Sequence, residues 1–184
     1  AFYKLHNFLA THTNFYWTDF SSEISDEAMI HPNAYIASRN VRIGKGTIIE
    51  PGVIVNERSI IGQDVVIRSG CVIGAHGMSY QRSNSKIIEV VHAGGVHVQD
   101  RVTVDENSAI SSAVFGGFTQ IGQDTKISVR VHVGHGSSIG KRCLIASGVT
   151  ISGSVIIGDN VWIGSGATIS NEVRIGDWAN VSIG

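Results

Sequence analysis

The sequence predicts an all-β fold: a parallel β-helix of six-residue repeats, with a short N-terminal helix and one protruding loop. The first observation is an aliphatic residue that returns every six positions over long stretches of the chain. The second is the glycine content, 22 glycines in 184 residues against two prolines, which is well above the usual share of about 7% and indicates many tight corners. The third is a pair of breaks in the repeat, which predict segments that leave the coil.

The six-residue step is longest in the C-terminal third. A small or β-branched residue follows each aliphatic four positions later. A period of six matches neither the helix nor the strand, whose side chains repeat at about 3.6 and 2.0 residues. It fits a short strand plus a corner, so that three units close one triangular coil and equivalent aliphatics stack into interior columns about 4.8 Å apart. The unbroken run is Ile121, Ile127, Val133, Ile139, Ile145, Ile151, Ile157, Ile163, Ile169 and Ile175.

The breaks divide the chain. Residues 1–23 lack the repeat and are expected to form a helix and linker, because Phe2, Leu5, Phe8 and Leu9 have the spacing of one helix face. Residues 24–184 are expected to form the β-helix, with a loop insertion over residues 74–97. A shorter interruption lies between residues 110 and 121. Insertions in repeat proteins tend to collect on a binding face, so we expect a ligand near both.

Composition excludes several classes of function. The net charge is −1 and no basic stripe is present, which argues against nucleic acid and anionic membrane as partners. No signal peptide and no apolar run of membrane-spanning length is visible. Cys71 and Cys143 lie in apolar repeat positions without a CxxC spacing, so a reducing, cytoplasmic compartment is expected.

The repeat places an imidazole beside a glycine. Val133 is an interior residue, so His135 falls at the edge of the coil, and one coil later the same corner carries Gly153. A neutral imidazole can accept a proton from an attacking amine, and a glycine amide can donate to a developing oxyanion. The pair therefore predicts acyl transfer, although a solvated corner histidine would show the same spacing.

Two alternatives stay open on these residues alone. His92 and His97 have a spacing that two zinc ligands could use, as in a γ-carbonic-anhydrase-like enzyme, although ordinary loop histidines are expected more often. The chain could also be a non-catalytic trimeric binding protein. Further candidates for substrate binding lie in the loop or near the His135 corner: His76, Met78, Tyr80, His132, Asn171 and Glu172.

Several segments resemble a known family. They are residues 1–5 and 30–34, the loop opening at residues 72–80, Thr103-Val104-Asp105, Val133-Gly134-His135 and Ile151-Ser152-Gly153-Ser154. Together they resemble the left-handed β-helix acyltransferases, above all the UDP-3-O-acylglucosamine N-acyltransferases of lipid A biosynthesis and shorter nucleotide-sugar N-acyltransferases.

The resemblance implies a left-handed coil, a homotrimer, His135 as catalytic base and Gly153 as oxyanion donor. It also implies transfer of an acyl group from acyl carrier protein or coenzyme A to the amine of a nucleotide-linked amino sugar, in lipid A or surface-polysaccharide synthesis. No bound cofactor and no metal is expected. The sequence departs from the family at Gly136, where Asn is usual, and at Glu172, where the lipid A enzyme has a histidine.

Overall fold

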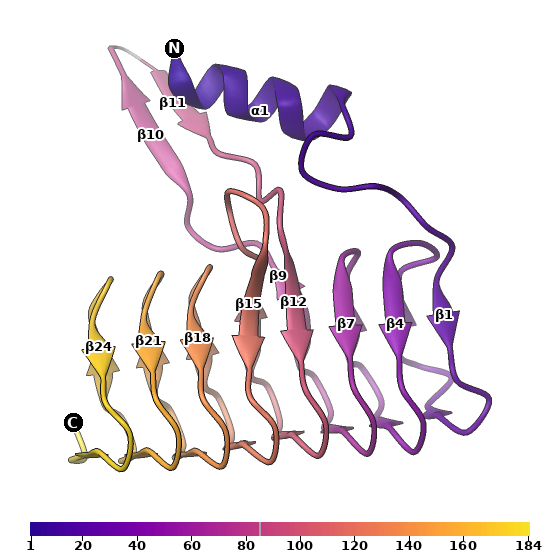
Figure 1. Cartoon of the computed structure of the whole chain (residues 1–184), viewed down its shortest axis with the longest axis vertical. Helices are drawn as coiled ribbons and strands as arrows, with labels where there is room; N and C mark the ends of the chain where they lie inside the picture. Colours follow the sequence, from indigo (N-terminus) through magenta and orange to yellow (C-terminus); the bar gives the residue numbers. More distant parts are fainter. Residues whose placement is uncertain (85) are drawn as a thin grey trace.

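The computed structural model describes residues 1–84 and 86–184, and most of them wind into one long coil (Figure 1). Short strands pass in rotation through three parallel sheets, which form the three faces of a prism. The winding is left-handed, with the N-terminal coils at one end and the C-terminal coils at the other (Figure 1). The predicted left-handed parallel β-helix is therefore confirmed.

Each sheet takes one strand from each coil. The first contains β1 (Glu23–Ile24), β4 (Val41–Ile43), β7 (Ser59–Ile61), β12 (Gly95–Val98), β15 (Phe118–Ile121), β18 (Ser138–Ile139), β21 (Ile156–Ile157) and β24 (Arg174–Ile175). The second contains β2 (Met29–Ile30), β5 (Ile48–Ile49), β8 (Val66–Ile67), β13 (Thr103–Val104), β16 (Lys126–Ile127), β19 (Leu144–Ile145), β22 (Trp162–Ile163) and β25 (Asn180–Val181). The third contains β3 (Tyr35–Ile36), β6 (Ile54–Val55), β9 (Val72–Ala75), β14 (Ala109–Ser111), β17 (His132–Val133), β20 (Thr150–Ile151) and β23 (Thr168–Ile169).

The core consists of the aliphatic columns inside the prism. In the first sheet Ile121 pairs with Ile139, and Ile139 pairs with Ile157, with all three side chains buried. The small or β-branched residues that follow each aliphatic four positions later stack into a second column, the small-residue column. This column also contains Ser and Thr, because the backbone of the next coil can accept hydrogen bonds from their hydroxyls. The Thr125 hydroxyl donates to the Gly140 carbonyl and the Ser137 hydroxyl to the Ser152 carbonyl, both at 2.8 Å.

Both cysteines lie in this small-residue column as free, buried thiols. Burial raises the pKa of Cys71 to about 11 and also raises that of Cys143. A buried thiol with a raised pKa carries little thiolate, so both cysteines have the surroundings of core residues.

An arm rises from one edge of the prism. The helix α1 (Phe2–His12) lies beside the antiparallel hairpin of β10 (Tyr80–Ser83) and β11 (Lys86–Glu89) (Figure 1). The chain leaves the prism after β9 and returns at β12, which spans Gly95–Val98. The hairpin therefore belongs to the segment that breaks the repeat.

Within the single chain, the helix docks largely through polar side chains that its apolar spacing does not predict. His6 is buried and bonds to the Tyr16 hydroxyl and the Val91 carbonyl, each at 2.8 Å. Phe2, Leu5 and Phe8 remain 62%, 58% and 55% exposed. Polar side chains dock the helix because the irregular backbone after the hairpin offers unpaired carbonyl and amide groups.

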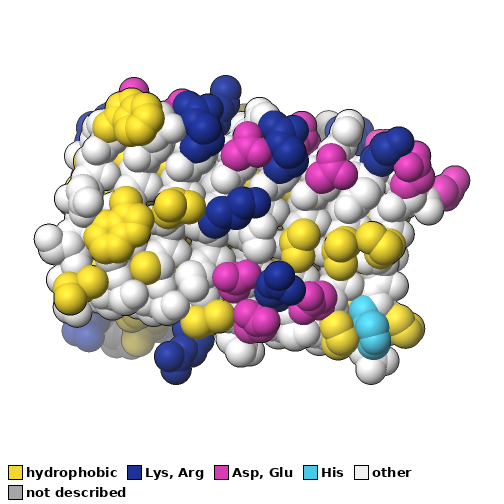
Figure 2. Space-filling model, turned by 90° about the horizontal axis from the view of Figure 1, so that it is seen from below, with side chains coloured by type: hydrophobic (Ala, Val, Ile, Leu, Met, Phe, Trp, Pro, Cys, Tyr) yellow, Lys and Arg dark blue, Asp and Glu magenta, His cyan; other side chains and the backbone are white. Residues whose placement is uncertain are grey.

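The outer face of the second sheet is seen from below in Figure 2. Apolar side chains gather towards its C-terminal end, and charged side chains occupy the middle (Figure 2). Leu144 and Trp162 lie on neighbouring strands of this sheet, and both are exposed, as is Trp178 shortly before β25. Arg68, which directly follows β8, pairs with Glu50 at 2.9 Å. In the described part of the chain, no helix has the length and apolar character needed to cross a bilayer.

Candidate active site

The site is built on one corner of three successive coils. The corner holds Gly136, Ser154 and Glu172, all with left-handed backbone at φ 66°, 59° and 63°. Glycine adopts this conformation without strain, which suits it to position 136. The turn that follows β17 carries His135 just before this corner, where the imidazole is half-buried.

His135 lies directly against Gly153. A Cβ placed on Gly153 would be 2.6 Å from both Cε1 and Nε2 of the His135 ring. Gly153 has no left-handed backbone. The glycine is therefore required by the close approach of the ring and not by its own dihedral angles. The structure brings the two residues together on one edge of the coil.

The Gly153 amide is already engaged, which differs from the free donor expected from sequence. It donates to Oδ1 of Asn171 at 2.9 Å. The same bond recurs along other edges: the amides of Lys141 and Asp159 donate to side-chain oxygens of the next coil at 2.8 Å. An Asn or Asp side chain at a corner thus accepts from a backbone amide of the preceding coil at several places in this fold. The sequence pattern did not reveal that Asn171 makes this bond to Gly153.

His135 belongs to a cluster of three imidazoles. The rings of His92 and His135 meet edge-to-face at 88°, with centroids 5.9 Å apart. The ring of His76 stacks on His92 at 5.6 Å. Burial lowers the pKa of His135 and of His92, and the neighbouring imidazoles lower that of His92 further. Both rings therefore favour the neutral form.

His92 is the member of this cluster whose place sequence analysis missed. It is 8% exposed, and its Nδ1 lies 2.6 Å from the Ser112 carbonyl while Nε2 lies 3.0 Å from the Ser79 hydroxyl. These bonds join both interruptions of the repeat, since Ser79 precedes the hairpin and Ser112 follows β14. No periodic pattern links the two interruptions, so only the tertiary structure shows the contact.

The spacing of His92 and His97 does not produce a zinc site. His97 lies on β12 against the ring of Phe118, with centroids 5.9 Å apart, whereas His92 lies among His76, Ser79 and His135. Within residues 1–84 and 86–184, no three His, Cys, Asp or Glu side chains are grouped so that they could hold a metal ion.

Two cavities flank the imidazole cluster. One, of about 200 Å³, lies beside His135 and is lined by Tyr3 of α1, Met78 and Tyr80 of the arm, and Val114 and Phe115. Phe115 follows β14 in the second interruption. The side chains of Met78 and Tyr80 are 91% and 51% exposed. The lining also includes Ser79 and Gln81, so this cavity is mixed in character and brings both apolar and polar side chains within reach of the base.

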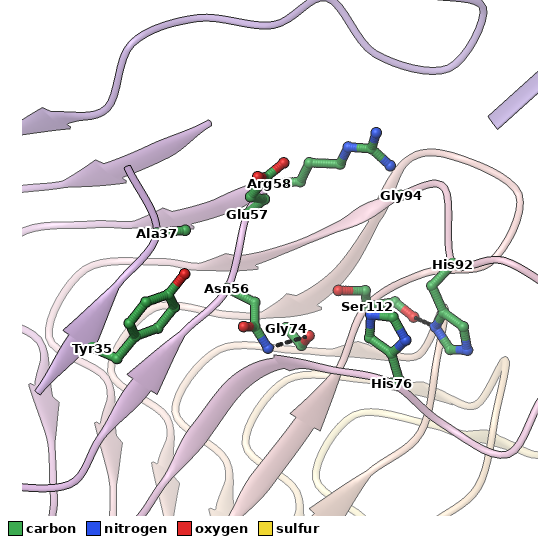
Figure 3. Close-up of a pocket in the computed structure, with 10 residues that line it drawn as sticks. All are labelled: Tyr35, Ala37, Asn56, Glu57, Arg58, Gly74, His76, His92, Gly94 and Ser112. Atoms are coloured by element: carbon green, nitrogen blue, oxygen red, sulfur yellow. Dashed lines mark hydrogen bonds between the residues drawn. The ribbon is translucent and has the colours of Figure 1, made fainter. Parts of the chain in front are cut away.

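The other cavity, of about 320 Å³, is polar. Figure 3 shows Tyr35, Asn56 and Arg58 around it, with the rings of His76 and His92 at one end. Nη1 of Arg58 donates to the Ala93 carbonyl at 3.1 Å, while its buried Nε has no partner within the described residues. Hydroxyl, amide, imidazole and guanidinium groups suit a polar, hydrogen-bonding ligand better than an acyl chain.

The other predicted residues are divided between these surfaces. His76 lines the polar cavity, and Met78 and Tyr80 line the cavity beside His135. His132 is half-buried on β17, and burial, followed by the neighbouring His135, lowers its pKa. The exposed Glu172 meets the His135 corner through its backbone, since its amide donates to the Gly153 carbonyl at 3.1 Å.

Comparison with known proteins identifies the repeat. The bacterial transferase hexapeptide family (six repeats) matches residues 40–75 and 118–153, and the second segment contains both His135 and Gly153. A solved structure of the UDP-N-acetylglucosamine acyltransferase of Francisella novicida superposes with a TM-score of 0.74 and 25% identity, over 88% of this chain and 59% of that one.

Two relatives found by sequence comparison are named UDP-3-O-acylglucosamine N-acyltransferases. The UDP-3-O-acylglucosamine N-acyltransferase of Anaeromyxobacter sp. (strain Fw109-5) is 31% identical over 125 residues, which cover 65% of this chain and 35% of the relative. UDP-3-O-acylglucosamine N-acyltransferase 1 of Francisella tularensis subsp. holarctica (strain OSU18) is 37% identical over 108 residues, 58% of this chain and 31% of the relative. The matches span about a third of the length of these curated relatives. The predicted resemblance is thus confirmed: the chain carries hexapeptide repeats and is similar to the UDP-3-O-acylglucosamine N-acyltransferases.

Proposed function

We propose that this protein is an N-acyltransferase that moves an acyl group from a thioester to the amine of a nucleotide-linked amino sugar. The observation that carries the proposal is the His135 imidazole lying against Gly153, beside a cavity lined partly by apolar side chains and within the repeats that match the transferase family. The names of the relatives support the reaction class and the kind of acceptor.

The chemistry requires a neutral base at the reacting nitrogen. The amine attacks the thioester carbonyl carbon, a C–N bond forms, and His135 takes the proton that the nitrogen loses. The tetrahedral intermediate then collapses, the C–S bond breaks, and the imidazolium returns the proton to the departing thiolate. Because burial lowers the pKa of His135, most of its rings are neutral at pH 7 and ready to accept this proton.

The oxyanion needs a hydrogen-bond donor near Gly153. We propose the Gly153 amide, released when the exposed Asn171 side chain turns away from it. The carbonyl then lies between His135 and Gly153, so the acyl chain would extend over Met78 and Tyr80, and the acceptor would approach from His76 and the polar cavity. His132, Asn171 and Glu172 would border the same site.

The carrier and assembly are further parts of the proposal. The donor would be acyl carrier protein or coenzyme A carrying the acyl group, used as a substrate in the cytoplasm. We propose a homotrimer, because Phe2, Leu5 and Phe8 on the arm and Trp162 on the prism leave apolar surface uncovered on a single chain. Light scattering of the purified protein measures the number of chains.

The test is thiol release from acyl-coenzyme A and acyl carrier protein thioesters, with UDP- and dTDP-amino sugars as acceptors. We expect His135→Ala to lower kcat by at least about 10²-fold, because general-base catalysis contributes about 10²–10⁴-fold. His97→Ala is the matched control, since His97 is also half-buried with a pKa lowered by burial but lies on β12 beside Phe118. Full activity in His135→Ala would refute the proposal, and no thiol release by the unmodified protein would favour a non-catalytic binding protein.

A further inference from the structure

Among the residues that the structure describes, His135 has no hydrogen-bonding partner of the kind that usually orients a catalytic histidine. Within residues 1–84 and 86–184, neither ring nitrogen of His135 makes a hydrogen bond to the protein. Two packing contacts bear on the ring directly: the α-carbon of Gly153, and the ring of His92, which meets it edge-to-face with centroids 5.9 Å apart. The orientation of the base therefore depends on what holds His92.

His92 is held at both ring nitrogens. A carbonyl oxygen can only accept, so Nδ1 of His92 carries the proton that it donates to the Ser112 carbonyl at 2.6 Å. In the neutral ring, Nε2 then accepts from the Ser79 hydroxyl at 3.0 Å. Both polar atoms of a buried imidazole are thus satisfied with the ring uncharged.

The partners of His92 are themselves fixed by backbone bonds. The Ser112 amide donates to the Ala75 carbonyl at 2.9 Å, and the Ser79 carbonyl accepts from the Val90 amide at 2.7 Å. One of these bonds ties the return from β14 to the end of β9, and the other closes the base of the hairpin. His92 is therefore anchored to two rigid places on the scaffold.

We infer that His92 is a positioning residue for His135: a neutral imidazole, locked by Ser112 and Ser79, sets the angle of the base. This inference rests on the proposed function. In a Ser-His-Asp triad the carboxylate orients the catalytic histidine through a hydrogen bond. Here His92 would orient His135 through ring packing.

A neutral positioning group has a chemical consequence. When His135 accepts the proton of the amine, the imidazolium meets the uncharged ring of His92 and is not repelled by it. His92 also shields His135 from water, which is part of the burial that keeps the base neutral. In the part of the chain that the structure describes, the other ionisable groups near the pair are the imidazoles of His76 and His132, and the phenols of Tyr3 and Tyr80 in the cavity beside His135.

The test compares three variants with the unmodified protein. His92→Ala removes the ring, and His92→Phe keeps an aromatic ring but loses both hydrogen bonds. The matched control is His97→Phe, an equal substitution at a half-buried imidazole that packs on Phe118 instead of His135. Thermal unfolding of each variant checks the fold.

Two readouts are measured. For kcat, we expect a loss on the order of 10²-fold in His92→Ala, a smaller loss in His92→Phe and none in His97→Phe, with KM nearly unchanged, because misplacing a base by about 1 Å costs about 10²-fold. The second readout is the titration of His135, followed by NMR of ¹³C-histidine-labelled protein. We expect its pKa to rise towards the ordinary value in His92→Ala only.

The two readouts test the proposed function and the positioning role of His92 independently. An unmodified protein without acyl transfer would overturn the proposed function, while the NMR titration would still show whether His92 controls the His135 ring. A His135 titration unchanged in His92→Ala would overturn the positioning role even if acyl transfer is observed. A loss of kcat as large in His97→Phe as in the His92 variants would overturn it too, because the effect would then reflect general destabilisation.

Discussion

Replacing Gly153 by alanine perturbs the His135 ring with a single methyl group. The added Cβ would lie 2.6 Å from Cε1 and Nε2 of the imidazole, and ordinary contact begins near 3.4 Å. The ring must therefore retreat by about 1 Å. A displacement of this size costs about 10²-fold in rate, or about 2.7 kcal/mol of transition-state stabilisation.

The fold should tolerate the change. Gly153 does not have left-handed backbone, so alanine adds no dihedral strain, and a half-buried side chain can give way. We expect kcat to fall about 10²-fold in thiol-release assays while the midpoint of thermal unfolding changes little. Gly176→Ala is the matched control, because a Cβ there meets no atom within 4 Å and its backbone is not left-handed.

The result that would refute this reasoning is specific. If Gly153→Ala keeps the kcat of the unmodified protein, then the position of the ring beside Gly153 has no part in catalysis. If Gly153→Ala and Gly176→Ala lose activity equally, the loss comes from the substitution type and not from the contact with His135.

Two further predictions concern the base and the oxyanion donor. Burial lowers the pKa of His135, and the base must be neutral, so kcat/KM should be lost as pH falls through a value below the ordinary 6.5. The titration of the acceptor amine is measured separately. A loss of kcat/KM that sets in above pH 6.5 would contradict the assignment of His135 as the base. Asn171→Ala removes the group that occupies the Gly153 amide, so kcat should be retained or raised, whereas KM should rise if Asn171 also borders the substrate. A loss of kcat of about 10²–10³-fold would instead assign the oxyanion contact to the Asn171 side chain.

The prism follows from the sequence because its order is local and periodic. Ile121, Ile139 and Ile157 pair in register since the step of six is unbroken over these coils. The same winding is why the approach of His135 to Gly153 could be inferred from spacing alone. The relatives identified by comparison have names of the kind that the repeat and the loop opening predicted.

Contacts that join separate interruptions of the repeat could not be predicted in this way. Sequence spacing paired His92 with His97, but the structure places His92 against His135, because the return from the hairpin lays it across the loop that holds Ser112. Helical spacing placed Phe2, Leu5 and Phe8 on one face, but it gave no sign that His6 makes the docking bonds within the chain.

The sequence by itself thus determined the architecture and one edge of the site, because a fixed period converts position along the chain into position in space. Only the tertiary structure decided what surrounds that edge: the His92 ring beside the base, the Asn171 oxygen on the Gly153 amide, and the two cavities. The physical reason is that these contacts depend on where non-periodic loops and long side chains come to rest. Packing and hydrogen-bond satisfaction fix those places across many coils, and no repeat encodes them.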